Sequence, residues 1–119
     1  MHILVVDDSK AMRMIVRRTL RLAGFRVEIT EAPDAEQALQ MLKNQQIDLV
    51  LCDWNMPGTT GLELLEKIRS AGNKVKFGFV TTECSVEMRT AASNAGALFM
   101  ITKPFTADTF QKTLAPLIG

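Results

Sequence analysis

The chain has 119 residues, a length typical of one domain that buries a core without disulfide or metal staples. Hydrophobic residues make up 47% of it and charged residues 23%, which excludes an intrinsically disordered protein. The formal net charge of +1 gives no reason to expect nucleic acid or an anionic membrane as a partner. Four arginines crowd the first expected helix, and we interpret them as a solvated helix face. They are Arg13, Arg17, Arg18 and Arg21.

The cysteines and the N-terminus bear on where the protein works. Cys52 and Cys84 have no spacing typical of a metal or redox site, which favours a reducing compartment. No basic segment followed by a long apolar stretch opens the chain, and it lacks the roughly eighteen consecutive apolar residues of a membrane-spanning helix. We therefore expect a cytoplasmic protein that is not inserted in a membrane.

Short apolar runs with the length of β-strands recur along the chain. Most are apolar at successive positions, which is typical of strands that are buried on both faces of a parallel sheet. The expected strands with such runs are 3–6, 49–52, 77–80 and 97–101. The segment 27–30 alternates apolar and polar residues instead, which predicts an edge position. Gly78 inside a strand either allows a close backbone approach or weakens the strand.

A helical spacing of apolar residues follows each of these runs. The first expected helix has Asp8 or Ser9 as its N-cap and ends at Gly24. Pro33 can open the second, because proline suits the first turn of a helix.

The remaining three helices have different end signals. Thr60 and Glu63 have capping-box spacing at the start of the third. The fourth, over 85–95, has no large aliphatic stripe, and we expect it to be lightly anchored. Pro116 should end or distort the last helix, because a proline in a helix interior loses a hydrogen bond and clashes with the preceding turn.

Alternation of five strands and five helices predicts an α/β fold: a doubly wound five-stranded parallel sheet in a three-layer sandwich. Right-handed crossovers leave few topologies, and we expect the flavodoxin-like order 2-1-3-4-5. This order brings the carboxyl ends of strands one and three together. Asp7, Asp8 and Asp53, which follow those ends, should therefore meet.

Such an acidic pocket suits phosphoryl chemistry. Three neighbouring carboxylates repel one another and need a counter-charge, and an all-oxygen cluster favours Mg²⁺. A metal beside a carboxylate can support phosphoryl transfer, with Asp53 as the nucleophile of an aspartyl-phosphate. Lys103 and the Thr81 hydroxyl, at two other strand ends, would bind phosphate oxygens. Each residue alone has an ordinary structural explanation. However, four separate segments each place a residue type that this chemistry needs at a predicted strand end.

These motifs in combination resemble the receiver domains of bacterial two-component response regulators, in particular the single-domain chemotaxis type. The resemblance extends from residue 3 to about residue 117. It is carried by Val5-Val6-Asp7-Asp8, Asp53-Trp54-Asn55-Met56-Pro57, Thr81 and Lys103-Pro104-Phe105. The family has the flavodoxin-like strand order, so the order given above is not independent of the resemblance.

The resemblance implies a role for each residue of the acidic pocket. Asp53 would be the phospho-acceptor and, with Asp8, a direct Mg²⁺ ligand. The backbone carbonyl of Asn55 would be a third ligand, and Asp7 would act through water.

Other positions would handle the phosphoryl group. Thr81 and Lys103 would bind it, and the residues two after the acceptor and two after the threonine, here Asn55 and Glu83, influence its lifetime. The Lys103-Pro104 peptide bond is expected to be cis, as in the family.

Two positions depart from the family pattern. Met100 replaces the usual Tyr or Phe of the fifth strand, and methionine has neither a hydroxyl nor a ring to switch between two positions. This argues against an aromatic coupling to Thr81. Phe99 should face the opposite side of the strand and is not an obvious substitute. Thr59-Thr60 replaces the common Met-Asp, but Thr60 still offers a cap.

The favoured interpretation is a receiver domain over residues 1–119 without an output domain, a signalling protein that assists its own phosphotransfer and dephosphorylation. Its expected partners are a sensor histidine kinase and a downstream protein target such as a flagellar switch component. We expect a monomer that binds no nucleic acid. Its surface formed by the fourth helix, fifth strand and fifth helix would change on phosphorylation.

Alternatives belong to other classes. A phosphate sink or phosphorelay receiver would accept phosphoryl groups without a switched output, which Met100 makes conceivable. A phosphatase or phosphotransferase with an aspartyl nucleophile would need a general acid and a cap, but Asn55 is not an acid and no insertion is long enough for a cap. A flavodoxin is less favoured, because Asp7 and Asp8 would repel the flavin phosphate.

Overall fold

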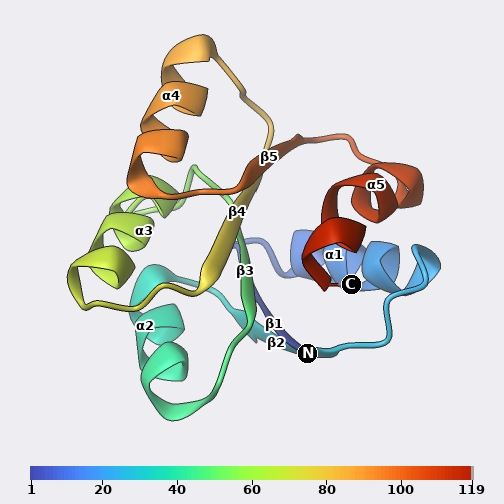
Figure 1. Cartoon of the computed structure of the whole chain (residues 1–119), viewed down its shortest axis with the longest axis horizontal. Coiled ribbons are helices and arrows are strands. Elements are labelled where there is room, and N and C mark those ends of the chain that lie inside the picture. The colour runs from blue at the N-terminus through green and yellow to red at the C-terminus, as the bar shows by residue number, and fades with distance from the viewer. Residues whose placement is uncertain (119) are drawn as a thin grey trace.

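Strands and helices alternate throughout residues 1–118, which the computed structural model describes (Figure 1). The strands are β1 (His2–Val6), β2 (Glu28–Ala32), β3 (Leu49–Cys52), β4 (Lys76–Thr81) and β5 (Phe99–Thr102). The helices are α1 (Lys10–Leu22), α2 (Ala35–Asn44), α3 (Gly61–Ser70), α4 (Val86–Ala95) and α5 (Ala107–Ile118).

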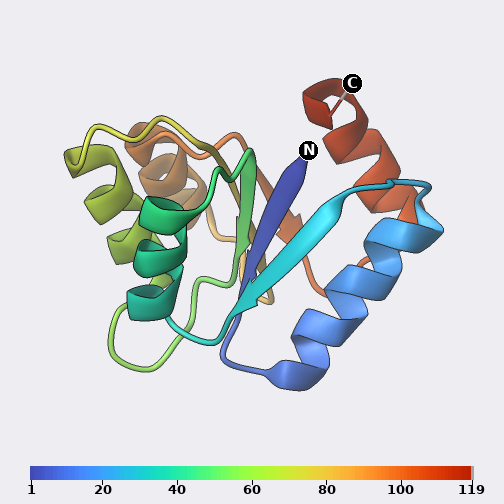
Figure 2. The same ribbon diagram turned by 90° about the horizontal axis from the view of Figure 1, so that it is seen from below.

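The strands form one parallel sheet in the order β2-β1-β3-β4-β5, which confirms the predicted fold class. Helices α1 and α5 cover one face, and α2, α3 and α4 cover the other (Figure 2). In the central pair, Val6 is in register with Cys52. The segments that follow β1 and β3 therefore leave the sheet side by side at its carboxyl edge.

Each face of the sheet has its own core. Successive residues of a strand point to opposite faces, so a strand that is buried on both sides must be apolar throughout. The core beneath α2, α3 and α4 includes Leu4, Val6, Val50, Cys52, Phe77 and Phe79. The core beneath α1 and α5 includes Ile3, Val5, Leu49, Leu51, Val80 and Phe110. The edge strand β2 is mostly exposed or half-buried, as its alternating sequence predicts.

Several predicted helix ends are confirmed. The Ser9 side chain caps α1, and Gly24 follows that helix with a φ of 93°. The capping box of α3 is complete, because the Thr60 hydroxyl accepts from the Glu63 backbone and the Glu63 carboxylate accepts from the Thr60 backbone.

Two proline interpretations need correction. Pro33 does not open α2: Asp34 is the N-cap, and its carboxylate accepts from the Gln37 backbone N–H at 2.8 Å. An aspartate that can cap a helix satisfies a free N–H there, which proline cannot do. Of the two effects expected of Pro116, ending the helix is wrong, because α5 continues through it to Ile118. This helix is held by the buried side chains of Phe110 and Leu114, six and two residues before Pro116.

Helix α4 is lightly anchored, as its sequence predicts. Only Ala92 among its residues is buried, and the Val86 side chain is 75% exposed. Between α4 and β5 lies a cavity of about 130 Å³, which Arg89, Ala92 and Met100 help to line. Met100 packs toward the α2–α4 side of the sheet and Phe99 toward the α1–α5 side, so their predicted opposite orientations are confirmed.

Candidate acidic phospho-acceptor site

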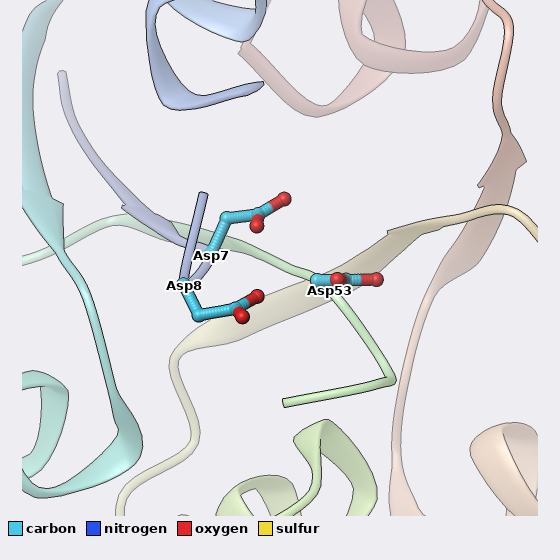
Figure 3. A group of neighbouring side chains, drawn as sticks. All are labelled: Asp7, Asp8 and Asp53. Carbon is cyan, nitrogen blue, oxygen red and sulfur yellow. The ribbon is translucent and has the colours of Figure 1, made fainter. Parts of the chain in front are cut away.

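Three aspartates meet where β1 and β3 end (Figure 3). Asp7 and Asp8 follow β1, Asp53 follows β3, and each offers a carboxylate oxygen within 4.8 Å of the others. Asp7 is buried, Asp53 is half-buried and Asp8 is exposed. The strand order thus brings together the three carboxylates that the sequence placed at separate strand ends.

Lys103 supplies a positive charge to this cluster from the loop after β5. Its Nζ lies 3.2 Å from Asp7 Oδ2 and 3.7 Å from Asp53 Oδ1. The Lys103 side chain is only 12% exposed, so water screens these contacts weakly. The Lys103 backbone N–H donates to the carbonyl of Thr81, and the Lys103-Pro104 bond is cis as expected.

Thr81 ends β4 beside this lysine and is fully buried. Its Oγ1 has no hydrogen-bond partner within residues 1–118, which makes it the one buried side-chain polar atom left unsatisfied there. Burying an unpaired hydroxyl costs about 1–3 kcal/mol. Such an atom at the rim of a charged site is a natural donor to a ligand.

The electrostatics of Asp53 follow from its surroundings. Burial is the largest influence and raises the pKa of its carboxyl, while the ammonium of Lys103 opposes that rise. The charge of Asp7 raises the pKa further, and the backbone amides of Asn55 and Trp54 lower it. The carboxylate is therefore less stable here than in water, which favours an added cation.

The start of α3 lies close against the turn that carries Asp53. A Cβ built on Gly61 would lie 2.2 Å from the Asp53 carbonyl oxygen, so only glycine fits at this position. The Gly61 N–H donates to the Trp54 carbonyl at 2.9 Å, which closes the turn after Asp53. The Trp54 ring packs on Phe79, with 4.8 Å between ring centroids. Asp53 thus stands on a tightly closed turn.

The other predicted site residues lie around this cluster. Asn55 is exposed two residues after Asp53, and Glu83 is exposed in the loop between β4 and α4. Met100 lies on β5, two strands away from β3, where it packs against the core and lines the α4–β5 cavity. Neither Glu83 nor Met100 belongs to the acidic group itself.

The arginines of α1 are not simply a solvated face. Arg13 and Arg17 both pair with Glu31 of β2, at 2.9 and 3.1 Å. Arg13 also donates to the backbone carbonyl of Asp7 at 2.6 Å. The interpretation is therefore wrong for these two residues, although Arg18 and Arg21 are exposed as expected. The only sequence signal was a charge pattern, because the Arg13–Glu31 contact joins residues that are distant in the chain.

Comparison with known proteins identifies the class. The model of the response regulator receiver domain family matches residues 3–115. The chain therefore belongs to the receiver domain family of two-component signalling proteins, which confirms the resemblance of its motifs. Within residues 1–118, no helix is long and apolar enough to cross a membrane.

Relatives of this chain include chemotaxis proteins of the CheY type. The chain is 44% identical to chemotaxis protein CheY-3 of Vibrio cholerae over 117 residues, covering 96% of this chain and 88% of that protein. It is 38% identical to CheY of Pseudomonas aeruginosa, covering 96% and 93%. A solved structure of Vibrio cholerae CheY4 superposes with a TM-score of 0.88 at 34% identity, covering 98% and 97%.

Proposed function

We propose that this chain is a single-domain response regulator that accepts a phosphoryl group on Asp53 from a sensor histidine kinase. The observation that carries the proposal is the position of Asp53. Its half-buried carboxylate lies 3.7 Å from the Lys103 ammonium and beside the Asp7–Asp8 pair. A phosphoryl group on the Asp53 oxygen would therefore lie within reach of both the Lys103 ammonium and a cation held by the aspartates.

The residues present fit a divalent cation. The cluster offers carboxylate oxygens only, the ligand type that Mg²⁺ prefers. The adjacent Cys52 does not compete as a ligand, because burial raises the pKa of its thiol well above the usual value. Asp8, Asp53 and the Asn55 backbone carbonyl would hold the ion directly, with Asp7 acting through water. Bound Mg²⁺ would neutralise negative charge on the phosphoryl oxygens.

The chain's own groups would serve the transfer. An Asp53 carboxylate oxygen forms the new bond to phosphorus as the bond from phosphorus to the kinase imidazole breaks, and the electron pair stays with the imidazole. Lys103 and the Thr81 hydroxyl donate hydrogen bonds to phosphoryl oxygens, which gives the Thr81 hydroxyl the partner it lacks. The protein thereby assists its own phosphotransfer and dephosphorylation without acting on a separate substrate.

The output would be phosphorylation-dependent protein binding in the cytoplasm. Helix α4 has a single buried residue and a cavity beneath it, and weakly packed elements are those that move between states. The surface of α4, β5 and α5 would change when Thr81 turns toward the phosphoryl group. Because the relatives are named chemotaxis proteins, we assign the downstream partner to motility, as a component of the flagellar switch.

A phosphate sink or relay receiver is the second candidate, and Met100 favours it. This side chain lines the α4–β5 cavity but has no hydroxyl or ring to exchange between two fixed positions. In that case Asp53 would still be phosphorylated, and no partner would distinguish the two forms.

Trp54 allows both functions to be tested, because it adjoins Asp53. Its fluorescence should respond saturably to Mg²⁺ and change again with beryllofluoride, while Asp53→Asn should lose the second response. A pull-down with and without beryllofluoride then separates the candidates. Selective capture of a motility protein supports the switch, and equal capture of every partner supports the sink. The proposal fails if neither Mg²⁺ nor beryllofluoride binds, as measured by calorimetry.

A further inference from the structure

We propose that Arg13 is a positioning residue for the acidic cluster, which fixes the backbone of Asp7 against the end of β2 through Glu31. The inference rests on the proposed function, because it concerns how well the cluster holds a cation. Arg13 lies in the second turn of α1, five residues after Asp8, and its side chain reaches back over the turn that carries both aspartates.

The guanidinium of Arg13 makes two contacts at once. Its Nη1 donates to the Asp7 carbonyl at 2.6 Å, and its Nε donates to Glu31 Oε1 at 2.9 Å. The Arg13 side chain is 13% exposed and that of Glu31 27%, so both bonds are partly shielded from water. Charge-assisted bonds of this kind are short and geometrically specific, and the planar fork of arginine can serve two acceptors together.

Strand β2 thereby holds Asp7 from both sides of its backbone. The Asp7 N–H donates to the Ala32 carbonyl at 3.1 Å, while the Asp7 carbonyl accepts from Arg13, which Glu31 orients. Arg17 steadies Glu31 in turn, with Nη2 at 3.1 Å from Oε2. Ala32, which contacts Asp7 directly, and Glu31, which orients Arg13, are adjacent at the end of this edge strand.

This bracing opposes the repulsion within the cluster. Asp7 and Asp8 are consecutive and lie near Asp53, so a free turn would relax to separate the three carboxylates. By fixing the Asp7 backbone, Arg13 keeps the carboxylates gathered before a cation arrives. Preorganised ligands bind a cation more tightly, because less ordering remains to be done on binding.

A purely electrostatic role and a positioning role of Arg13 predict opposite changes in Mg²⁺ affinity when Arg13 is replaced. Arg13 is a cation beside a proposed cation site, so removing its charge should strengthen Mg²⁺ binding if electrostatics alone matters. If Arg13 positions the cluster, its removal should weaken Mg²⁺ binding. Arg18 provides the matched control: it lies on the same helix, is exposed, and makes no ion pair or side-chain hydrogen bond within the described residues.

The experiment measures the Mg²⁺ dissociation constant by Trp54 fluorescence and calorimetry. Arg13→Gln should weaken binding about tenfold, the lower end of the effect of outer hydrogen-bonding partners. Arg18→Gln should leave it nearly unchanged. Arg13→Lys keeps the charge but not the fork, so it should recover only part of the affinity. Glu31→Gln should also weaken binding, and its effect should not add to that of Arg13→Gln.

Thermal unfolding in EDTA shows whether each variant is folded. If Arg13→Gln does not fold, Arg13→Lys decides: it keeps the positive charge, so weaker Mg²⁺ binding by this variant would support positioning. Unchanged or tighter Mg²⁺ binding by the folded variants would overturn the role of Arg13 while leaving the proposed function intact. Absence of Mg²⁺ binding by the wild-type protein would overturn both.

Discussion

The ring of Phe99 in β5 occupies the space where a side chain at Gly78 of β4 would stand. The two residues are in register, and a Cβ built on Gly78 would lie 2.1 Å from Phe99 Cζ. The ring packs with the core beneath α1 and α5. Gly78 therefore does allow a close approach, but of the Phe99 ring and not of a backbone segment as the sequence suggested.

Gly78→Ala should destabilise the fold by about 1–3 kcal/mol, because the methyl group must displace the Phe99 ring from its packing. Urea unfolding measures the change. The matched test repeats Gly78→Ala in a Phe99→Ala background, where the space is open and most of the cost should vanish. An equal cost in both backgrounds would show that the ring is not the obstacle.

Asp53→Asn should raise the free energy of unfolding at neutral pH in metal-free buffer. Burial raises the pKa of Asp53 in the folded state, so the folded protein holds this proton more strongly than the unfolded chain does. The resulting penalty is absent below the unfolded-state pKa and complete above the folded-state pKa. The stability difference between variant and wild type should therefore grow as pH rises through that window.

Urea unfolding in EDTA across acid and neutral pH tests this sign. A variant that is less stable than the wild type at neutral pH would show that the pairing of Asp53 with Lys103 outweighs burial. Added Mg²⁺ should stabilise the wild type and have a smaller effect on the variant, since binding to the folded state alone shifts the equilibrium.

The capping box of α3 carries a pH dependence of opposite sign. Thr60→Ala should cost about 1 kcal/mol through the lost N-cap, as measured by thermal unfolding. Hydrogen bonds from Thr60 lower the pKa of Glu63, so the contribution of Glu63 is present above its unfolded-state pKa and is lost as pH falls through its folded-state pKa. Glu63→Gln should therefore matter at neutral pH and not in acid. If Glu63→Gln lowered the stability equally at neutral and acid pH, the capping role of the Glu63 carboxylate would be contradicted.

Arg69 stabilises the carboxyl end of the lightly packed helix α4 through hydrogen bonds to backbone carbonyls. Its Nη1 donates to the carbonyls of Asn73 and Val75 at 3.0 and 2.8 Å, and its Nη2 to that of Gly96 at 3.1 Å. Arg69→Met should destabilise the fold by about 2 kcal/mol. Hydrogen exchange should accelerate at the end of α4, and unchanged exchange there would show that Arg69 does not secure this helix.

Local patterns in the sequence predict most of the sheet and of the acidic cluster. The buried strands are recognisable because they are apolar at successive positions, and each aspartate is marked by the strand end that precedes it. The capping box is equally local, since Thr60 and Glu63 lie three residues apart. Once the strands are ordered, their carboxyl ends bring these side chains together without further information.

Contacts between distant segments could not be predicted in this way. Arg13 and Glu31 are eighteen residues apart, and only the packing of α1 beside β2 brings them together. At the start of α2, Asp34 and not Pro33 marks the helix end, because the Asp34 carboxylate accepts from the Gln37 backbone N–H. Pro116 remains inside α5 because tertiary packing of this helix overrides its local preference. For Arg13 and Pro116 the deciding interaction is tertiary, whereas at the start of α2 it is a local cap, from Asp34 to Gln37.

The most direct test is to determine which residue becomes phosphorylated. The protein would be incubated with Mg²⁺ and acetyl phosphate, and its intact mass measured alongside that of Asp53→Asn. Reductive cleavage of the acyl phosphate followed by peptide mapping would then locate the modified residue. We expect a single phosphoryl adduct on Asp53 that is absent without Mg²⁺ and in the variant. An adduct of equal yield in Asp53→Asn, or one mapped to another residue, would contradict Asp53 as the acceptor.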